Sequence, residues 1–99
     1  MEQEKIILIV KATINPEAMD SFNAYIGRLT ELFEKVKAES IGHFPIRETF
    51  VGNDAPTFIA IYRFENRQAF DEVYESEAYK NEMLPLRDKG FKNLEVYLS

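Results

Sequence analysis

Two segments of this chain are apolar on both faces of the strand that each would form. The first is Lys5–Thr13 (KIILIVKAT) and the second is Pro56–Phe64 (PTFIAIYRF). Side chains alternate between the two faces of a β-strand, so a strand of this kind is stable where both of its faces are covered. We therefore expect these segments to be the central strands of a sheet.

The segment after the first strand carries the signals of a long amphipathic helix. Asn15 suits an N-cap and Pro16 suits the first helical position. A second helix is predicted after Asn66 and a further turn or two after Ser76, and Pro85 should end the regular helix because it has no N–H donor. The apolar stripe of the first helix recurs at intervals of three and four residues, at Phe22, Tyr25, Ile26, Leu29, Leu32, Phe33 and Val36.

Two more segments complete the predicted order. Pro45–Val51 should pair with the Pro56–Phe64 strand across a turn at Gly52–Ala55, and Asn93–Leu98 alternates as a last strand. Two right-handed crossovers in a βαββαβ chain place the first and third strands at the centre. We therefore predict one α+β domain over residues 1–99, a ferredoxin-like sandwich with a four-stranded antiparallel sheet and helices on one face.

The predicted sheet has more apolar surface than two helices can cover. Its first strand offers Leu8 and Val10 on one side and Ile7 and Ile9 on the other. A monomer would expose one of these faces as a large apolar patch, which usually marks an interaction site. The simplest cover is a second copy, so we expect a homodimer with sheet packed on sheet, a dimeric α/β barrel.

Composition narrows the class of partner and the compartment. The formal net charge is −5 and basic residues do not cluster, whereas nucleic acids and anionic membranes select for positive patches. An RNA-recognition module shares this strand order, but TFIAIYRF lacks the glycine of its third-strand motif. Cysteine is absent, and we see neither a signal peptide nor a run of about 20 apolar residues. We expect a soluble cytoplasmic protein without nucleic-acid or membrane partners.

The second half of the chain resembles a known superfamily. The stretch FIAIYRFENRQAFDEVYESEAYKNEMLPLR and the closing KNLEVYL are similar to the dimeric α/β-barrel superfamily, and most similar to a domain-of-unknown-function family within it. The positions that carry the resemblance are Phe70, Ser76, Tyr79, Leu84, Pro85, Leu86 and Arg87. The resemblance implies the fold and the dimer. The superfamily includes cofactor-independent antibiotic-biosynthesis monooxygenases, muconolactone-isomerase-like proteins and haem-degrading enzymes, whose Asn, Trp and His site cannot be present because this chain has no Trp.

His43 is the one side chain that titrates near neutral pH without help, and it is our candidate general acid or base. If the hairpin turns about Asn53 and Asp54, residue 47 pairs with 60 and residue 45 with 62. Arg47 and Tyr62 would then share the face of His43 and could orient a small anionic or phenolic substrate. The alternative is a solvated loop histidine beside an edge-strand arginine.

Other polar residues allow two interpretations each. Arg87 could clamp a substrate carboxylate, or it could pair with Glu82 or Asp88 at the surface. Tyr25 fits a core tyrosine whose hydroxyl reaches the surface, and Ser76 fits a helix cap better than a nucleophile because it lacks flanking glycines.

The sequence predicts neither a metal nor a cofactor. A single histidine and no cysteine leave no histidine cluster or thiolate site within the chain, and the scattered glycines form no phosphate-binding loop. Two classes of function remain. One is a small enzyme or binding protein that acts on a small organic molecule without a cofactor, like a monooxygenase or isomerase. The other is a non-catalytic dimeric structural or interaction module.

Overall fold

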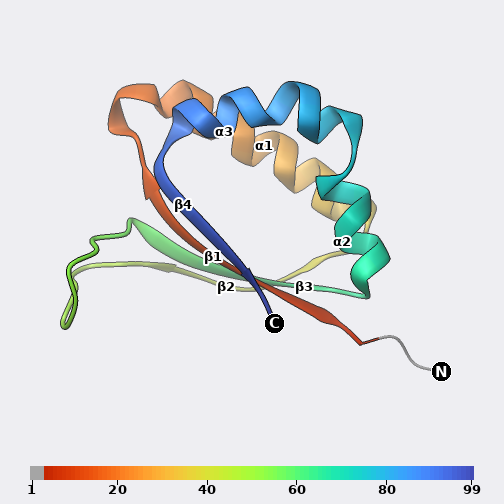
Figure 1. Ribbon diagram of the computed structural model, residues 1–99, viewed down its shortest axis with the longest axis horizontal. Helices are drawn as coiled ribbons and strands as arrows, with labels where there is room; N and C mark the ends of the chain where they lie inside the picture. Colours follow the sequence, from red (N-terminus) through yellow and green to blue (C-terminus); the bar gives the residue numbers. More distant parts are fainter. Residues whose placement is uncertain (1–3) are drawn as a thin grey trace.

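The computed structural model describes residues 4–99 as two layers, a four-stranded antiparallel sheet and a layer of helices on one of its faces (Figure 1). The order of strands in the sheet is β2-β3-β1-β4, so the predicted ferredoxin-like arrangement, with the first and third strands at the centre, is confirmed. The strands are β1 (Ile6–Ile14), β2 (Glu39–Pro45), β3 (Phe58–Phe64) and β4 (Phe91–Leu98). The helices are η1 (Pro16–Ala18), α1 (Met19–Lys35), α2 (Arg67–Tyr74), η2 (Ala78–Met83) and α3 (Leu84–Gly90).

The core lies between the sheet and the helices. Even-numbered residues of the two central strands face the helices, and Leu8, Ala12 and Phe64 have no exposed surface. From the helix layer, the buried side chains are Tyr25, Leu29, Phe33, Val73, Tyr79 and Met83. In residues 4–99, no helix is both long and apolar enough to span a membrane.

Among residues 4–99, no helix lies over the opposite face of the sheet, which we call the bare face (Figure 1). Its middle is apolar, with Ile9 paired with Ile61, and its ends carry the ion pairs Lys11–Asp54 and Arg63–Glu39 at 2.5 and 2.6 Å. The large apolar side chains of the bare face are Ile7, Ile9, Phe44, Ile59, Ile61 and Tyr97, of which Phe44 and Tyr97 are about half exposed. The surplus apolar surface that the sequence predicted is thus present on one face of the sheet.

The second strand begins and ends earlier than predicted. β2 spans Glu39–Pro45 rather than Pro45–Val51, and His43 pairs with Ala60 and Pro45 with Phe58, so the predicted pairs 47–60 and 45–62 are wrong. Residues 46–57 instead form a long arm that projects beyond the sheet and bends toward the side of the bare face (Figure 1).

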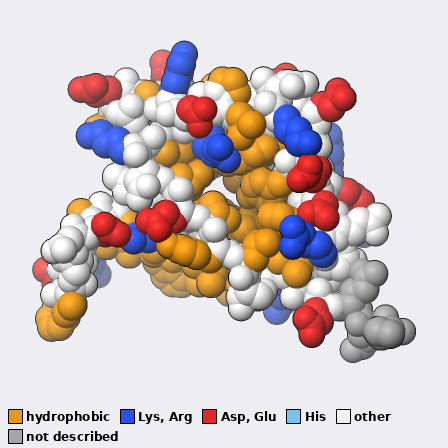
Figure 2. All heavy atoms as spheres, viewed as in Figure 1, with side chains coloured by type: hydrophobic (Ala, Val, Ile, Leu, Met, Phe, Trp, Pro, Cys, Tyr) orange, Lys and Arg blue, Asp and Glu red, His pale blue; other side chains and the backbone are white. Residues whose placement is uncertain are grey.

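The arm is an ordered extension that ends in apolar side chains. At its base Ile46 N donates to Thr57 O at 2.9 Å, and near its tip the Thr49 hydroxyl donates to the carbonyl of Asp54. Phe50 and Val51 at the tip are 92% and 83% exposed, and they account for the hydrophobic end of the arm in Figure 2. Two large apolar residues are therefore held away from the core of their own chain.

Pro85 does not end the helix as predicted, because it lies in the first turn of α3, where a missing N–H costs little. The turn before it is a π-helix in which Leu84 N donates to Tyr79 O, five residues back. The predicted cap is confirmed, since Tyr79 N donates to the Ser76 hydroxyl at 3.1 Å. The helix thus continues through the widened turn up to Gly90.

Candidate functional site

The structure does not bring together the three residues of the predicted pocket. His43 is exposed on the edge strand β2 and its ring lies 4.7 Å from that of Phe58. Tyr62 pairs with Ser40, and Arg47 lies in the arm beyond Thr57. Thr57 and Tyr62 are five strand positions apart, which corresponds to about 17 Å, so Arg47 and Tyr62 are too distant to act on one small substrate.

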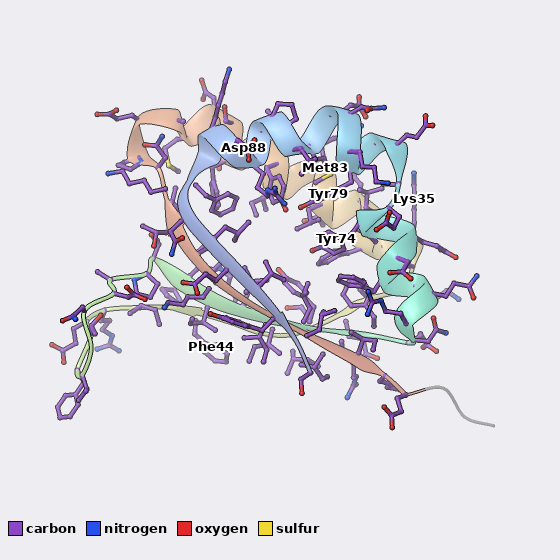
Figure 3. The ribbon with its side chains drawn as sticks, viewed as in Figure 1. Lys35, Phe44, Tyr74, Tyr79, Met83 and Asp88 are labelled. Carbon is purple, nitrogen blue, oxygen red and sulfur yellow. The ribbon has the colours of Figure 1, made fainter. Side chains whose placement is uncertain are left out.

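Arg87, in contrast, lies beside a cluster of buried tyrosines. Its Nη1 donates to the Tyr79 hydroxyl at 3.3 Å, and the Tyr79 and Tyr25 hydroxyls are 2.9 Å apart. Tyr25 and Tyr79 are each only 4% exposed. The Tyr74 ring packs against Tyr79 at 4.8 Å between centroids. We call Tyr25, Tyr74, Tyr79 and Arg87 the tyrosine cluster. Figure 3 shows Tyr74 and Tyr79 between the helices and the sheet, while Phe44 lies on the other side of the sheet.

The local sequence explains how α3 comes close enough to α1 to form this cluster. A Cβ atom at Gly90 would lie 2.9 Å from the Phe22 backbone, so α3 can approach α1 only with glycine at this position. Asn15 holds the C-terminal end of α3 by two hydrogen bonds. Its Nδ2 donates to Lys89 O at 3.1 Å, and its backbone N–H donates to Gly90 O at 2.9 Å. These contacts fix α3, which carries Arg87, against the start of the first helix.

The sequence interpretation missed the tyrosine cluster. It placed the Tyr25 hydroxyl at the surface, but this hydroxyl is bonded inside the protein. It also left Glu82 and Asp88 open as partners of Arg87. Glu82 pairs with Arg28 at 2.5 Å, whereas Asp88 forms the surface ion pair with Arg87, at 3.9 Å from its Nε and so too long for a hydrogen bond. The signal that could have found the cluster is a tyrosine on the apolar side of each helical segment.

Burial keeps the hydroxyls of Tyr25 and Tyr74 protonated. The pKa of Tyr25 and that of Tyr74 are raised far above that of an exposed tyrosine, chiefly because burial disfavours the phenolate and also because Tyr79 lies nearby. The positive charge of Arg87 acts in the opposite direction but does not cancel these effects. Tyr25 and Tyr74 are therefore neutral groups, and Arg87 is the cation of the cluster.

These raised pKa values predict a steep loss of stability in alkali. The unfolded chain ionises its tyrosines near pH 10 whereas folded Tyr25 and Tyr74 stay neutral, so their contribution is complete below pH 10 and declines above it. For each of these two residues, we expect the free energy of unfolding to fall by about 1.4 kcal/mol per pH unit above pH 10. Urea unfolding at pH 9, 10 and 11 measures how steeply the free energy of unfolding falls with pH. In Tyr25→Phe this fall should be smaller by the contribution of one tyrosine, about 1.4 kcal/mol per pH unit. Ionisation of Tyr25 and Tyr74 near pH 10 in the folded protein would contradict this prediction.

A cleft of about 630 Å³ opens beside Arg87, between α3 and β4. Its apolar wall consists of Phe91, Leu94 and Val96, and Phe91 also packs against Tyr25 with ring centroids 5.5 Å apart. Figure 2 shows the molecule hollowed between the helices and the sheet, with hydrophobic side chains around the hollow. The volume is in the range of pockets that hold small organic ligands. The cleft therefore combines a cation, buried phenols behind it and an apolar wall.

Tyr62 lines a second, smaller cleft of about 250 Å³ between α1 and the sheet, together with Phe33 and Ser40. Its ring meets that of Phe33 at 4.9 Å, and burial raises the pKa of its hydroxyl. Tyr62 thus faces the helices, on the β2 side of the sandwich. Of the residues proposed from sequence, Arg87 is the one that lines the cleft between α3 and β4.

Comparisons with known proteins agree with this architecture. A family model described as "Domain of unknown function (DUF1330)" matches residues 6–97, and no curated protein matches the chain. A solved protein of unknown function from Rhodopseudomonas palustris is 13% identical, with a TM-score of 0.86 over 99% of this chain and 82% of that one.

Two further solved structures are of proteins described by an activity. A putative antibiotic biosynthesis monooxygenase from Bacteroides thetaiotaomicron is 14% identical, with a TM-score of 0.64 over 97% of this chain and 88% of its own. SnoaB, a cofactor-independent oxygenase from Streptomyces nogalater, is 15% identical, with a TM-score of 0.60 over 97% and 91%. At these identities the likeness establishes the fold.

Proposed function

The chain belongs to the DUF1330 family. We propose that it binds a small organic molecule in the cleft between α3 and β4 and acts on it without a cofactor. The observation that carries the proposal is that Arg87, which lines this cleft, donates to the buried Tyr79, whose hydroxyl also bonds to that of Tyr25. The description of one structural neighbour as a cofactor-independent oxygenase supports the same type of chemistry.

The polar groups of the cleft support a binding role because they are costly to place there. A guanidinium that is partly withdrawn from water loses hydration, which must be offset by hydrogen bonds. Arg87 donates one such bond, to the Tyr79 hydroxyl, while the surrounding wall is apolar. A purely structural contact between α3 and the sheet could use apolar side chains alone. A ligand that bonds to Arg87 gives the arginine a function.

Blocking the cleft tests the proposal. We expect small aromatic fragments to shift the backbone amide signals of Phe91–Val96 in an NMR titration. Leu94→Trp should weaken this binding at least tenfold, because the indole occupies the space that the ligand needs. Ala24→Trp, at an exposed position of α1 outside the cleft, is the control and should leave binding unchanged. Fragments that bind elsewhere, or equally well to Leu94→Trp, would contradict the proposal.

The proposed assembly is a homodimer through the bare face. Ile9 and Ile61 lie at its middle, and the Lys11–Asp54 pair draws the arm toward the same side. Two copies related by a two-fold axis would cover each other's apolar surface, and the arm of each could reach the partner with Phe50 and Val51. The alternative function, a non-catalytic dimeric module, rests on this same face. This alternative predicts that the protein dimerises and that substitutions in the cleft have no effect on its function.

A further inference from the structure

We propose that the ligand of the cleft carries a carboxylate, or an equivalent anionic oxygen group, which Arg87 holds while an apolar body lies against Phe91, Leu94 and Val96. This inference rests on the proposed function and names its ligand class. The proposal starts from the hydrogen-bonding capacity of the guanidinium, which has five N–H donors arranged as a rigid fork.

The Arg87 guanidinium has more N–H donors than it uses in hydrogen bonds within residues 4–99. One donor is used by the Tyr79 hydroxyl, at 3.3 Å from Nη1. The nearest carboxylate, that of Asp88, lies 3.9 Å from Nε, and its side chain is 75% exposed to solvent. Among residues 4–99, the hydrogen bonds of Arg87 include none to an acidic side chain. The ion pair of Arg87 with Asp88 is therefore long and exposed to solvent, and within the described part of the chain no carboxylate is hydrogen-bonded to the guanidinium.

The hydroxyl chain behind Arg87 holds the guanidinium in place. Tyr79 accepts from Arg87 and shares a hydrogen bond with Tyr25, and both rings are fixed by burial. A fork anchored on one side can offer its remaining N–H groups to a carboxylate in the bidentate geometry that both groups favour. Less conformational entropy is lost on binding when the cation is already ordered. The cluster thus prepares Arg87 to bind an anion.

The lining of the cleft fits an anion with an apolar body. Arg87 and Lys92 are its cations and Asp88 its single acid, whereas the whole chain carries a net charge of −5. A local excess of positive charge on an acidic protein marks a preferred position for an anion. The apolar wall, with Val96 43% exposed, offers contact area to an aromatic or aliphatic group. A small aromatic or branched-chain carboxylate meets both requirements.

Matched acids and amides test this inference. We expect phenylacetate and hexanoate to bind at least tenfold more tightly than phenylacetamide and hexanamide, as measured by NMR titration of the Phe91–Val96 amides. Arg87→Met should remove the preference, and Arg87→Lys should restore part of it because the charge returns without the fork. Lys89→Met removes an exposed cation of α3 that does not line the cleft; it is the control and should change the preference less than threefold. Thermal unfolding of each variant verifies that it is folded.

The possible outcomes separate this inference from the proposed function. Equal binding of acid and amide at the cleft would overturn the anionic ligand class but leave small-molecule binding in place. A preference that persists in Arg87→Met would show that another group selects the anion. If none of the four probes perturbs Phe91–Val96 at millimolar concentration, both the anion inference and the proposed cleft are wrong.

Discussion

Ile61→Glu is expected to convert the proposed dimer into a monomer. Ile61 lies at the middle of the bare face, where it pairs with Ile9 on one side and Gly42 on the other. In a two-fold symmetric interface the substitution places two carboxylates among apolar side chains. Removing a carboxylate from water costs several kcal/mol in a real protein. Since about 1.4 kcal/mol corresponds to a tenfold change, we expect dimerisation to weaken by about a thousandfold or more.

The position for this substitution is chosen to avoid a compensating ion pair. Ile59 would be a poor choice, because it pairs with Lys11 and a glutamate there could bond to the lysine. Ala24→Glu adds the same charge to an exposed position of α1 on the other side of the molecule, and should leave the dimer intact. Sedimentation equilibrium at micromolar concentration gives the mass of each protein. A stable monomer of the unsubstituted chain would contradict the dimer itself.

The fold could be predicted because its central strands and its long helix are strongly patterned. β1 and β3 are apolar on both faces, and this alone places them at the centre of the sheet. β2 could not be found in the same way. Its side chains are mostly exposed, so the strand has no apolar alternation to detect. The more strand-like segment Pro45–Val51 belongs mostly to the arm, where Phe50 and Val51 are exposed.

The site was harder to predict than the fold, for a geometric reason. A stripe of apolar residues shows which side of a helix is buried, but not which buried hydroxyls will meet. Tyr25 and Tyr79 are 54 residues apart in sequence, and they meet because Gly90 lets α3 approach α1. Arg87 could be proposed from sequence, whereas its partner Tyr79 could not. His43 was proposed for its chemistry, but the pairing of β2 with β3 left it away from the cluster.

Phe64→Ala is expected to lower the free energy of unfolding by about 3–5 kcal/mol, the usual cost of removing a buried phenylalanine. Phe64 has no exposed surface, and its ring meets those of Phe33 and Phe70 edge-on, at 5.1 and 5.7 Å between centroids. These contacts join the sheet to both α1 and α2. Because a domain of this size has only about 5–15 kcal/mol of stability in total, the variant should be close to unfolding at room temperature.

Phe64 is also connected to the cleft through a series of aromatic contacts. Phe70 stacks on Tyr74 at 4.7 Å, and Tyr74 packs against Tyr79, so the cavity left by Phe64→Ala borders the aromatic contacts that support Arg87. Urea unfolding at fixed protein concentration measures the loss, with Phe64→Leu as the control at about 1 kcal/mol because it keeps most of the volume. A loss under 1 kcal/mol for Phe64→Ala would contradict the packing described for this core. If the folded fraction of Phe64→Ala also binds carboxylates more weakly, the aromatic core positions Arg87 as well as stabilising the fold.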